Sequence, residues 1–213
     1  MISVYKWMSM GLFLTAIVAY IVASSEAFTK VIFGNTLVFY GLLIVEILMV
    51  AYFSAKAKKM SAFSAMLLFL GYSAVNGLTL SIIFLIYTAA SIASTFLITA
   101  GTFGIMSVYG YVTKRDLTSV GNFCFMSLIG LIIASVVNIF MHSPILYWVT
   151  TYAGILIFVG LTAYDTQKIK ELNVIGNMGT DEDTKEAING ALILYLDFIN
   201  LFLDLIRIFG KRR

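Results

Sequence analysis

Charged residues and proline are scarce in this 213-residue chain: Asp, Glu, Lys and Arg together make up 12%, and there is one proline. Hydrophobic residues make up 61%, and the mean hydropathy is +0.97. Soluble globular domains carry about 25% charged residues, so this composition excludes that class and predicts an integral membrane protein. The apolar residues come in long runs rather than in short alternating segments, so the predicted spans are helices and not barrel strands.

Cysteine is also scarce, and lysine is absent from the middle of the predicted spans. The one cysteine, Cys124, lies inside an apolar run, which excludes an intrachain disulfide and a cysteine-based metal site. No lysine lies well inside a predicted span, and this excludes a retinal Schiff base. The net charge of +3 is too small, and the lysines are too scattered, for a protein that binds nucleic acid.

The long apolar runs predict an all-α fold with seven transmembrane helices in a single domain, residues 1–213. The approximate spans are 7–24, 36–55, 62–87, 92–112, 120–141, 145–164 and 187–209. Each is long enough to cross most or all of a hydrocarbon core of about 30 Å at about 1.5 Å per residue. Residues 25–34 are predicted to be a short loop, and residues 166–186 form the longest polar loop.

Lysine and arginine are unevenly shared between the two sides that seven spans define. One side receives Lys6, Lys56, Lys58, Lys59, Lys114, Arg115, Lys168, Lys170 and Lys185. The positive-inside rule makes that side cytoplasmic, but it would place the basic tail 211–213 on the opposite side. Two alternatives remain open: the last helix spans the membrane fully, or it is re-entrant and returns the tail to the cytoplasm. Its length and its continuous polar stripe favour full spanning.

The last apolar segment carries a polar stripe. Asp197, Asn200, Asp204 and Arg207 are spaced three, four and three residues apart, so they fall on one side of a helix. Charged groups facing lipid are costly, at about 2.5 to 3.5 kcal/mol each on insertion scales, which predicts a central helix wrapped by the other six. Asp204 and Arg207 are three residues apart and are expected to neutralise each other as an ion pair.

Asp165 and Asp197 form the most informative pair of ionisable residues. The chain reverses between the sixth and seventh spans, so the two carboxyl groups can come close. Two carboxylates held away from bulk water cannot both ionise cheaply, so the pair would share a proton and act as a pH-dependent switch or a transient Ca²⁺ site. The alternative is that Asp165 ends its helix beside Lys168 while Asp197 bonds a neighbouring hydroxyl or amide. Glu46, near the middle of the second span, is another acidic residue at membrane depth.

The segments LTAYDTQKIK (161–170) and GALILYLDFINLFLDLIRIFG (190–210) resemble the carboxyl-terminal signature of the transmembrane Bax inhibitor motif family, in particular its bacterial members. The resemblance implies six helices around a central seventh, and a pH-sensitive calcium leak in the bacterial inner membrane. The paired aspartates of the family match Asp165 and Asp197. In the implied mechanism they are hydrogen-bonded when protonated and closed, and they separate on deprotonation to open a pore on the cytoplasmic side.

This chain departs from the family pattern at two places. The member that best fits the mechanism has an arginine near the cytoplasmic end of the second helix, where this chain has Lys56, Ala57, Lys58 and Lys59. A lysine would then replace the arginine without its bidentate fork. The loop between the two aspartates is also longer and adds Asp181, Glu182 and Asp183.

We therefore expect a non-enzymatic channel that conducts cations and has no cofactor, with Ca²⁺ as the transported ion. Its partners are the lipid bilayer, Ca²⁺ and protons. The candidate pore or contact residues are Glu46, Asn200, Asp204 and Arg207. Two alternatives are a proton-coupled transporter that uses the same aspartates, and a non-conducting regulator of membrane stress or proteolysis that binds another membrane protein.

Overall fold

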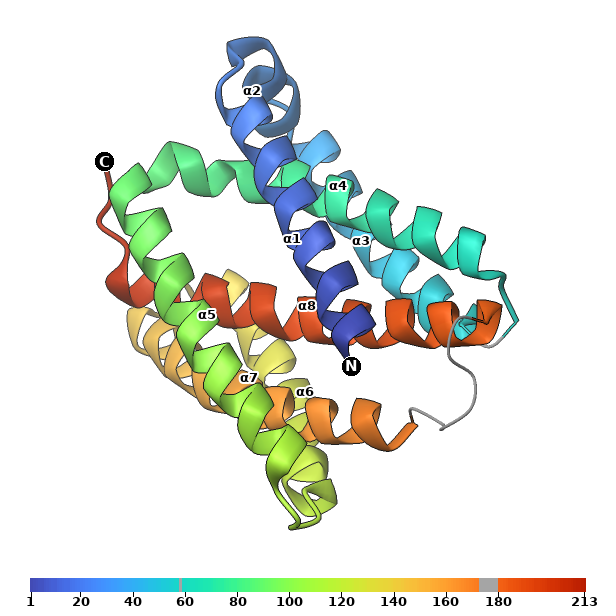
Figure 1. Cartoon of the computed structure of the whole chain (residues 1–213). Helices are drawn as coiled ribbons and strands as arrows, with labels where there is room; N and C mark the ends of the chain where they lie inside the picture. Colours follow the sequence, from blue (N-terminus) through green and yellow to red (C-terminus); the bar gives the residue numbers. More distant parts are fainter. Residues whose placement is uncertain (58, 173–179) are drawn as a thin grey trace. The chain divides into compact units, whose positions relative to one another are not determined.

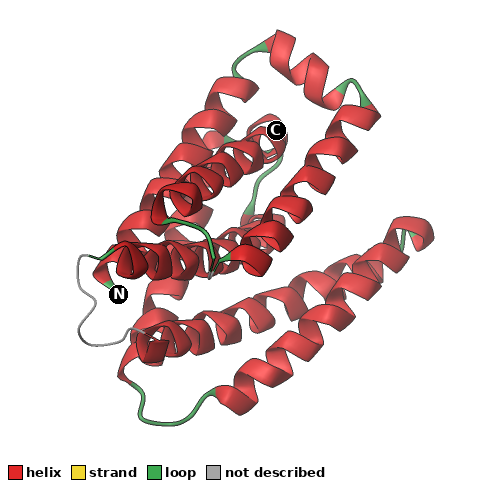
Figure 2. Ribbon diagram, turned by 90° about the vertical axis from the view of Figure 1, so that its right-hand side faces the viewer, coloured by secondary structure: helices red, strands yellow, loops and turns green. Residues whose placement is uncertain are grey.

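The chain is almost entirely helical. A computed structural model describes residues 1–57, 59–172 and 180–213, and within them it shows eight α-helices and no β-strand (Figure 2). The helices, labelled in Figure 1, are α1 (Ile2–Ala23), α2 (Glu26–Phe33), α3 (Thr36–Lys56), α4 (Ala62–Ile86), α5 (Ala89–Val112), α6 (Thr118–Met141), α7 (Pro144–Leu172) and α8 (Asp181–Phe209). The predicted all-α membrane class is confirmed.

Six of the described helices are long and apolar enough to cross a membrane: α1, α3, α4, α5, α6 and α7. Since α8 is not among them, the predicted count of seven spans is not confirmed. Helices α3 and α6 expose most of their apolar side chains, Leu37, Ile47 and Phe140 among them, as helices that face lipid do. By contrast, α8 is mostly buried and has two buried aspartates, Asp197 and Asp204.

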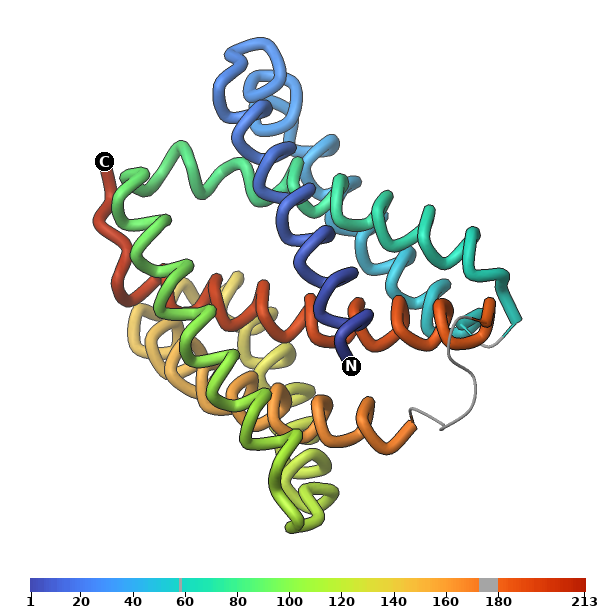
Figure 3. The backbone as a smooth tube through the Cα atoms, in the orientation of Figure 1, coloured from blue at the N-terminus to red at the C-terminus, as the bar shows by residue number. Residues whose placement is uncertain are grey.

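The chain divides into two compact units. The first unit comprises Met1–Ala89, Asn173–Tyr195 and Arg212–Arg213, of whose middle segment the structure describes residues from Thr180 onward. The second unit comprises Ala90–Leu172 and Leu196–Lys211. Helix α8 is one uninterrupted helix, drawn in orange and red in Figure 3, and it contributes residues to both units.

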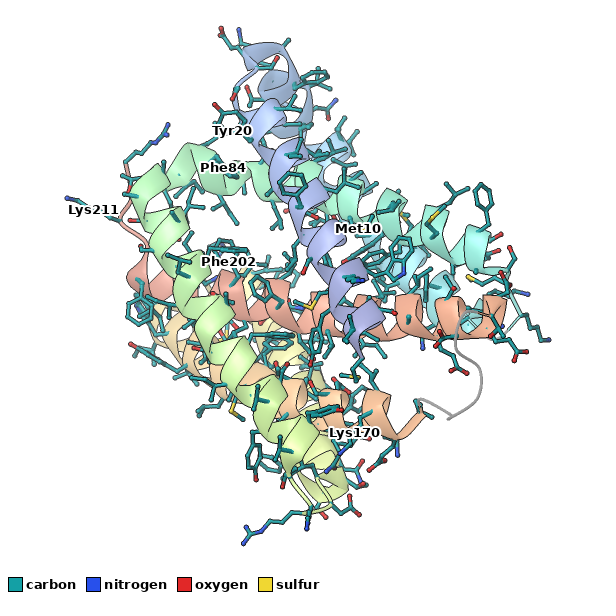
Figure 4. The ribbon with its side chains drawn as sticks, in the orientation of Figure 1. Met10, Tyr20, Phe84, Lys170, Phe202 and Lys211 are labelled. Carbon is teal, nitrogen blue, oxygen red and sulfur yellow. The ribbon has the colours of Figure 1, made fainter. Side chains whose placement is uncertain are left out.

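Helix α4 is central to the first unit, where it packs along α1 and against α3. The approach of α1 is close at Gly77, where a Cβ atom would lie 2.8 Å from the carbonyl oxygen of Thr15. Closer to the carboxyl-terminal end of α1, Tyr20 and Phe84 meet edge to face with ring centroids 6.2 Å apart (Figure 4). A small residue where two helices cross is typical of membrane helix packing.

In the second unit, α6 packs along α7. Their apolar core also includes residues of α8: the cluster consists of Cys124, Ile157, Phe158, Leu161, Leu201 and Leu205. Helix α5 contacts α8 through aromatic rings, since Phe96 and Phe103 both lie against Phe198, at 5.3 and 5.5 Å between centroids. The second unit therefore holds the carboxyl-terminal half of α8 between α5 and the α6–α7 pair.

The start of α8 and the residues that follow its end both contact α4. At its start, Asp181 Oδ2 accepts a hydrogen bond of 3.2 Å from the backbone N–H of Ala62, the first residue of α4. Beyond its end, Arg212 pairs with Tyr87, and the N–H of Arg213 donates to the carbonyl of Ile86, the last residue of α4. Within the first unit, the start of α8 and the residues 212–213 are thus tied to opposite ends of α4. Since α8 is not among the candidate spans, full spanning of this helix stays a prediction, and the re-entrant alternative stays open.

The structure corrects two loop predictions. Residues predicted as a loop form α2, a short helix with an exposed ion pair of 2.9 Å between Lys30 and Glu26. Helix α7 continues past Tyr164 to Leu172, and α8 begins at Asp181, so most of the predicted loop 166–186 is helical. Hydropathy falls after Tyr164, but Gln, Lys, Glu and Leu are good helix formers, and the helix continues beyond the apolar run. Residues 173–179 of that loop lie outside the described residues.

Candidate functional site

Asp165 and Asp197 are brought together in the second unit. Asp165 lies on α7, Asp197 lies on α8, and a side-chain hydrogen bond joins their carboxyl groups. Asp197 is 5% exposed, and its Oδ2 has no hydrogen-bond partner among the described residues. A hydrogen bond between two carboxyl groups needs a proton on one of them, since an ionised carboxylate is only an acceptor. We call Asp165 and Asp197 the aspartate dyad.

The residues on either side of Asp165 are fixed to α5. Thr166 is fully buried, and its hydroxyl is 3.2 Å from the hydroxyl of Ser107. The carbonyl oxygen of Ala163 lies so close to Gly110 that a Cβ atom at position 110 would overlap it. These two contacts hold the α7 backbone on both sides of Asp165, so the position of its carboxyl group is set by the fold.

We expect Gly110→Ala to lower the free energy of unfolding by about 1 to 3 kcal/mol, because the added methyl group must push α5 away from Ala163. Thermal unfolding in detergent would measure this change. The matched control is Gly101→Ala on the same helix, where a Cβ atom meets nothing within 4 Å. That change should be neutral or stabilising, by about 0.5 to 1 kcal/mol. Equal stability of the two variants would contradict this close contact.

Gln167 anchors α7 to the charged turn between α5 and α6. Its Oε1 accepts a hydrogen bond of 2.9 Å from the N–H of Leu117, and its Nε2 donates one of 2.8 Å to the carbonyl of Arg115. Gln167 is two residues from Asp165, so the dyad lies close to this turn. Because charged turns lie at the membrane surface, we expect the dyad to lie near the aqueous boundary.

The charged turn includes an acidic residue, Asp116, whose Oδ1 accepts a hydrogen bond of 2.8 Å from the N–H of Thr118. Hydrogen bonding from Thr118 lowers the pKa of Asp116 below its ordinary value. The turn therefore carries negative as well as positive charge at neutral pH, beside Lys114 and Arg115.

No lysine, arginine or histidine forms an ion pair with the dyad within the described residues. Lys168 lies 3.7 Å from Glu171, and Lys170 donates a hydrogen bond of 2.7 Å to the carbonyl of Tyr111 (Figure 4). The alternative in which Asp165 ends its helix beside Lys168 is wrong, because α7 continues to Leu172. Among the described residues, no ion pair therefore neutralises the charge of the dyad.

The basic cluster after α3 belongs to the first unit. Lys56 and Lys59 are exposed, and neither forms an ion pair within the part of the chain that the structure describes. Lys58 lies outside the described residues. The prediction that one of these lysines replaces the family arginine therefore stays a prediction.

The remaining stripe residues of α8 have their own partners. Arg207 Nη1 donates to Asp204 Oδ1 at 2.8 Å, as their spacing predicts, and the Arg207 guanidinium lies 5.6 Å from the ring centroid of Tyr147. Asn200 donates a hydrogen bond of 2.8 Å to the carbonyl of Leu196 on its own helix. Asp197 is therefore the stripe residue that needs a partner from another helix.

Glu46 is part of a hydrogen-bond network in the first unit. Its carboxyl oxygens accept bonds of 2.7 Å from Thr79 and 3.3 Å from Asn76, both on α4. The Tyr195 hydroxyl donates to Asn76 Oδ1 at 3.2 Å and lies 2.6 Å from the Thr15 hydroxyl. We call these five residues the Glu46 network. This network was not predicted from the sequence, although Asn76 and Thr79 are three residues apart and so share one face of a helix.

The described residues contain no group of three or more His, Cys, Asp or Glu side chains arranged to hold a metal ion. Calcium takes six to eight oxygen ligands, so two carboxyl groups do not make a resident calcium site.

Comparison with known proteins identifies the family. A family model described as "Inhibitor of apoptosis-promoting Bax1" matches residues 1–213. The chain belongs to this Bax1-I family. It is 54% identical over 220 residues to inner membrane protein YbhL of Escherichia coli K12, covering all of this chain and 92% of that protein. It is 45% identical over 217 residues to uncharacterized protein RP147 of Rickettsia prowazekii, covering 100% of this chain and 89% of the relative. It is 37% identical over 210 residues to an uncharacterized membrane protein of Streptococcus pyogenes serotype M1, covering 98% and 90%.

The membership confirms the resemblance seen in residues 161–170 and 190–210 and extends it over the whole chain. The inner-membrane relative, together with six helices that can cross a membrane, also confirms the predicted location. This Bax1-I protein is a multi-pass protein of the inner membrane.

Proposed function

We propose that this Bax1-I protein is a pH-sensitive cation leak channel, with Ca²⁺ as its cargo, and that the aspartate dyad is both gate and proton sensor. The observation that carries the proposal is the contact between two carboxyl groups, Asp165 and Asp197, without a cationic partner in the described residues. In this proposal the protein catalyses no reaction and needs no cofactor.

The direction of the pH response follows from the shared proton. At low pH a proton bridges Asp165 and Asp197, and the hydrogen bond holds α7 and α8 together. When the pH rises and the proton leaves, two like charges face each other in a poorly solvated site and repel. Separation of the two helices then opens the path, so the leak increases as pH rises.

The contact of Gln167 with the charged turn supports proton exchange with the nearby aqueous phase. That phase is the cytoplasm in the topology predicted from the basic loops. Lys56 and Lys59 remain candidates for the positive charge that the family arginine supplies, a role that a flexible lysine fills as a point charge.

Calcium flux from purified protein tests the proposal. In liposomes loaded with a calcium dye, we expect influx to rise from mildly acidic to mildly alkaline buffer and to fall again when the pH is reversed. The matched control is Glu171→Gln, which removes an exposed carboxylate from α7 one and a half turns beyond Asp165 and should leave the pH profile unchanged.

Two results would contradict the proposal. Absence of flux at every pH would favour a non-conducting regulator that acts on another membrane protein. Saturable proton flux that appears only when an organic or metal substrate is added would favour a proton-coupled transporter.

A further inference from the structure

One face of α5 carries a row of buried small polar residues. Five of its six buried positions follow one another at intervals of four residues: Ser91, Thr95, Thr99, Phe103 and Ser107. Residues four apart are neighbours on a helix, and each such step turns by about 40°, so these residues form one continuous stripe that winds round α5. We call Ser91, Thr95, Thr99 and Ser107 the hydroxyl stripe.

Three hydroxyl groups of the stripe have partners. Thr99 Oγ1 donates to the carbonyl of Thr95 at 2.8 Å, the usual bond of a threonine inside a helix. The Ser107 hydroxyl contacts Thr166, next to Asp165, and Ser91 Oγ accepts from the N–H of Lys211 at 2.9 Å. The stripe thus runs from the neighbourhood of the dyad to the residues that follow α8.

Thr95 is the exception. Its side chain is completely buried, and its Oγ1 has no hydrogen-bond partner among the described residues. An unpaired buried hydroxyl costs about 1 to 3 kcal/mol, and buried polar groups of this kind are commonly satisfied by ordered water. Unlike Thr99, Thr95 does not bond to the preceding turn of its own helix. Its hydroxyl group can therefore form a hydrogen bond with a water molecule.

Phe103 interrupts the stripe between Thr99 and Ser107. Its ring meets the ring of Phe198 edge to face, with centroids 5.5 Å apart, and the two residues are 4% and 3% exposed. Phe198 directly follows Asp197 in α8. An apolar pair therefore lies between the dyad end of the hydroxyl stripe and Thr95, and one of its rings is attached to the residue next to the proposed gate.

We propose that Phe103 and Phe198 form the hydrophobic constriction of the leak path. On the side of this constriction that is farther from the dyad, the part of the hydroxyl stripe that includes Thr95 is in contact with water and guides hydrated cations. We call this part the wet stripe. This inference rests on the proposed function. A narrow apolar constriction closes a pore by excluding water. When the contact between Asp197 and Asp165 breaks, α8 is free to rotate about its axis. Phe198, the next residue on the same rigid helix, then turns out of its contact with Phe103, and the constriction widens.

Flux measurements test the constriction. Phe103→Ala and Phe198→Ala should raise calcium influx in acidic buffer several-fold, toward the rate that the unaltered protein reaches in alkaline buffer. The matched control is Phe96→Ala: Phe96 also contacts Phe198, at 5.3 Å, but it lies off the buried stripe and is 42% exposed. That variant should keep the normal pH profile. Where an alanine variant fails to fold, Phe103→Leu or Phe198→Leu should show a smaller rise in the same direction.

Thiol labelling tests the wet stripe independently of flux. Because Cys124 is the one cysteine, Cys124→Ser gives a cysteine-free background. In that background, Thr95→Cys should react with a charged, water-soluble thiol reagent. Thr162→Cys is the matched control, because Thr162 is equally buried in the same unit and its Oγ1 is satisfied by the Phe158 carbonyl at 2.7 Å. It should not react.

Each outcome has a separate meaning. Equal resistance of Thr95→Cys and Thr162→Cys to the reagent would overturn the wet stripe, and acidic closure as tight as normal in the Phe103 and Phe198 variants would overturn the constriction. Either result leaves the dyad proposal standing if its own pH dependence holds. Absence of flux from the unaltered protein would instead remove the proposed function, and with it the constriction.

Discussion

Asp197→Asn should keep the leak closed at every pH, whereas Asp197→Ala should keep it open. The asparagine amide can donate a hydrogen bond to the Asp165 carboxylate without depending on a shared proton, so the contact between α7 and α8 survives deprotonation. Alanine removes the partner altogether. The same contrast is expected for Asp165→Asn and Asp165→Ala, because the hydrogen bond joins the two residues directly.

Initial rates of calcium influx, measured across a series of buffers, check this contrast. The unaltered protein should show a rate that rises with pH, both asparagine variants a low flat line, and both alanine variants a high flat line. Asp204→Asn is the control on the same helix, since Asp204 is also buried but pairs with Arg207. It should keep the slope of the pH profile. A normal slope of calcium influx against pH in both asparagine variants would contradict the gating role of the dyad.

Asn76→Leu is expected to be strongly destabilising in the first unit. Asn76 donates to Glu46 and accepts from Tyr195, so leucine would remove both bonds and leave the Tyr195 hydroxyl dependent on Thr15. We expect a loss of about 1 to 3 kcal/mol in the free energy of unfolding. Hydrogen bonds between membrane helices contribute modestly, so the loss should lie toward the lower end of this range.

Reversible unfolding in mixed detergent measures the loss. Asn200→Leu is the matched control, because Asn200 bonds only to the Leu196 carbonyl of its own helix, and its effect should stay within about 0.5 kcal/mol. In combination with Glu46→Gln, the Asn76→Leu change should cost less than the sum of the two single changes, since both act on one bond. Strict additivity would show that the Glu46 network does not act as a unit.

The dyad could be predicted from the sequence because ionisable residues are so rare in the apolar runs. With few carboxyl groups at membrane depth, the chain reversal between α7 and α8 made Asp165 one of two possible solutions for Asp197, and the resemblance of residues 161–170 and 190–210 favoured this pair. The pair of Asp204 and Arg207 followed from helical spacing alone. Composition and run length were also sufficient for the helical membrane class.

The Glu46 network and the unpaired hydroxyl of Thr95 could not be predicted in the same way. Asparagine, threonine and tyrosine are common in membrane helices, and their spacing does not tell which helices touch. Tyr195 stands between leucines and looks like part of an apolar face, yet its hydroxyl contacts Thr15 and Asn76. Helix ends failed for another reason: hydropathy marks where the apolar run stops, whereas α7 continues for two turns beyond it.

The length of α7 has a consequence for membrane voltage. From Pro144, a helix reaches Asp165 after about 32 Å, the full thickness of a hydrocarbon core of about 30 Å. The bonds of Gln167 to the turn at Arg115 place Asp165 at the same boundary. A charge that crosses the whole membrane changes in energy by about 2.3 kcal/mol per 100 mV, but a proton leaving this boundary crosses almost none of the potential. Proton binding to the dyad would therefore depend on the pH of the adjacent compartment and only weakly on the membrane voltage.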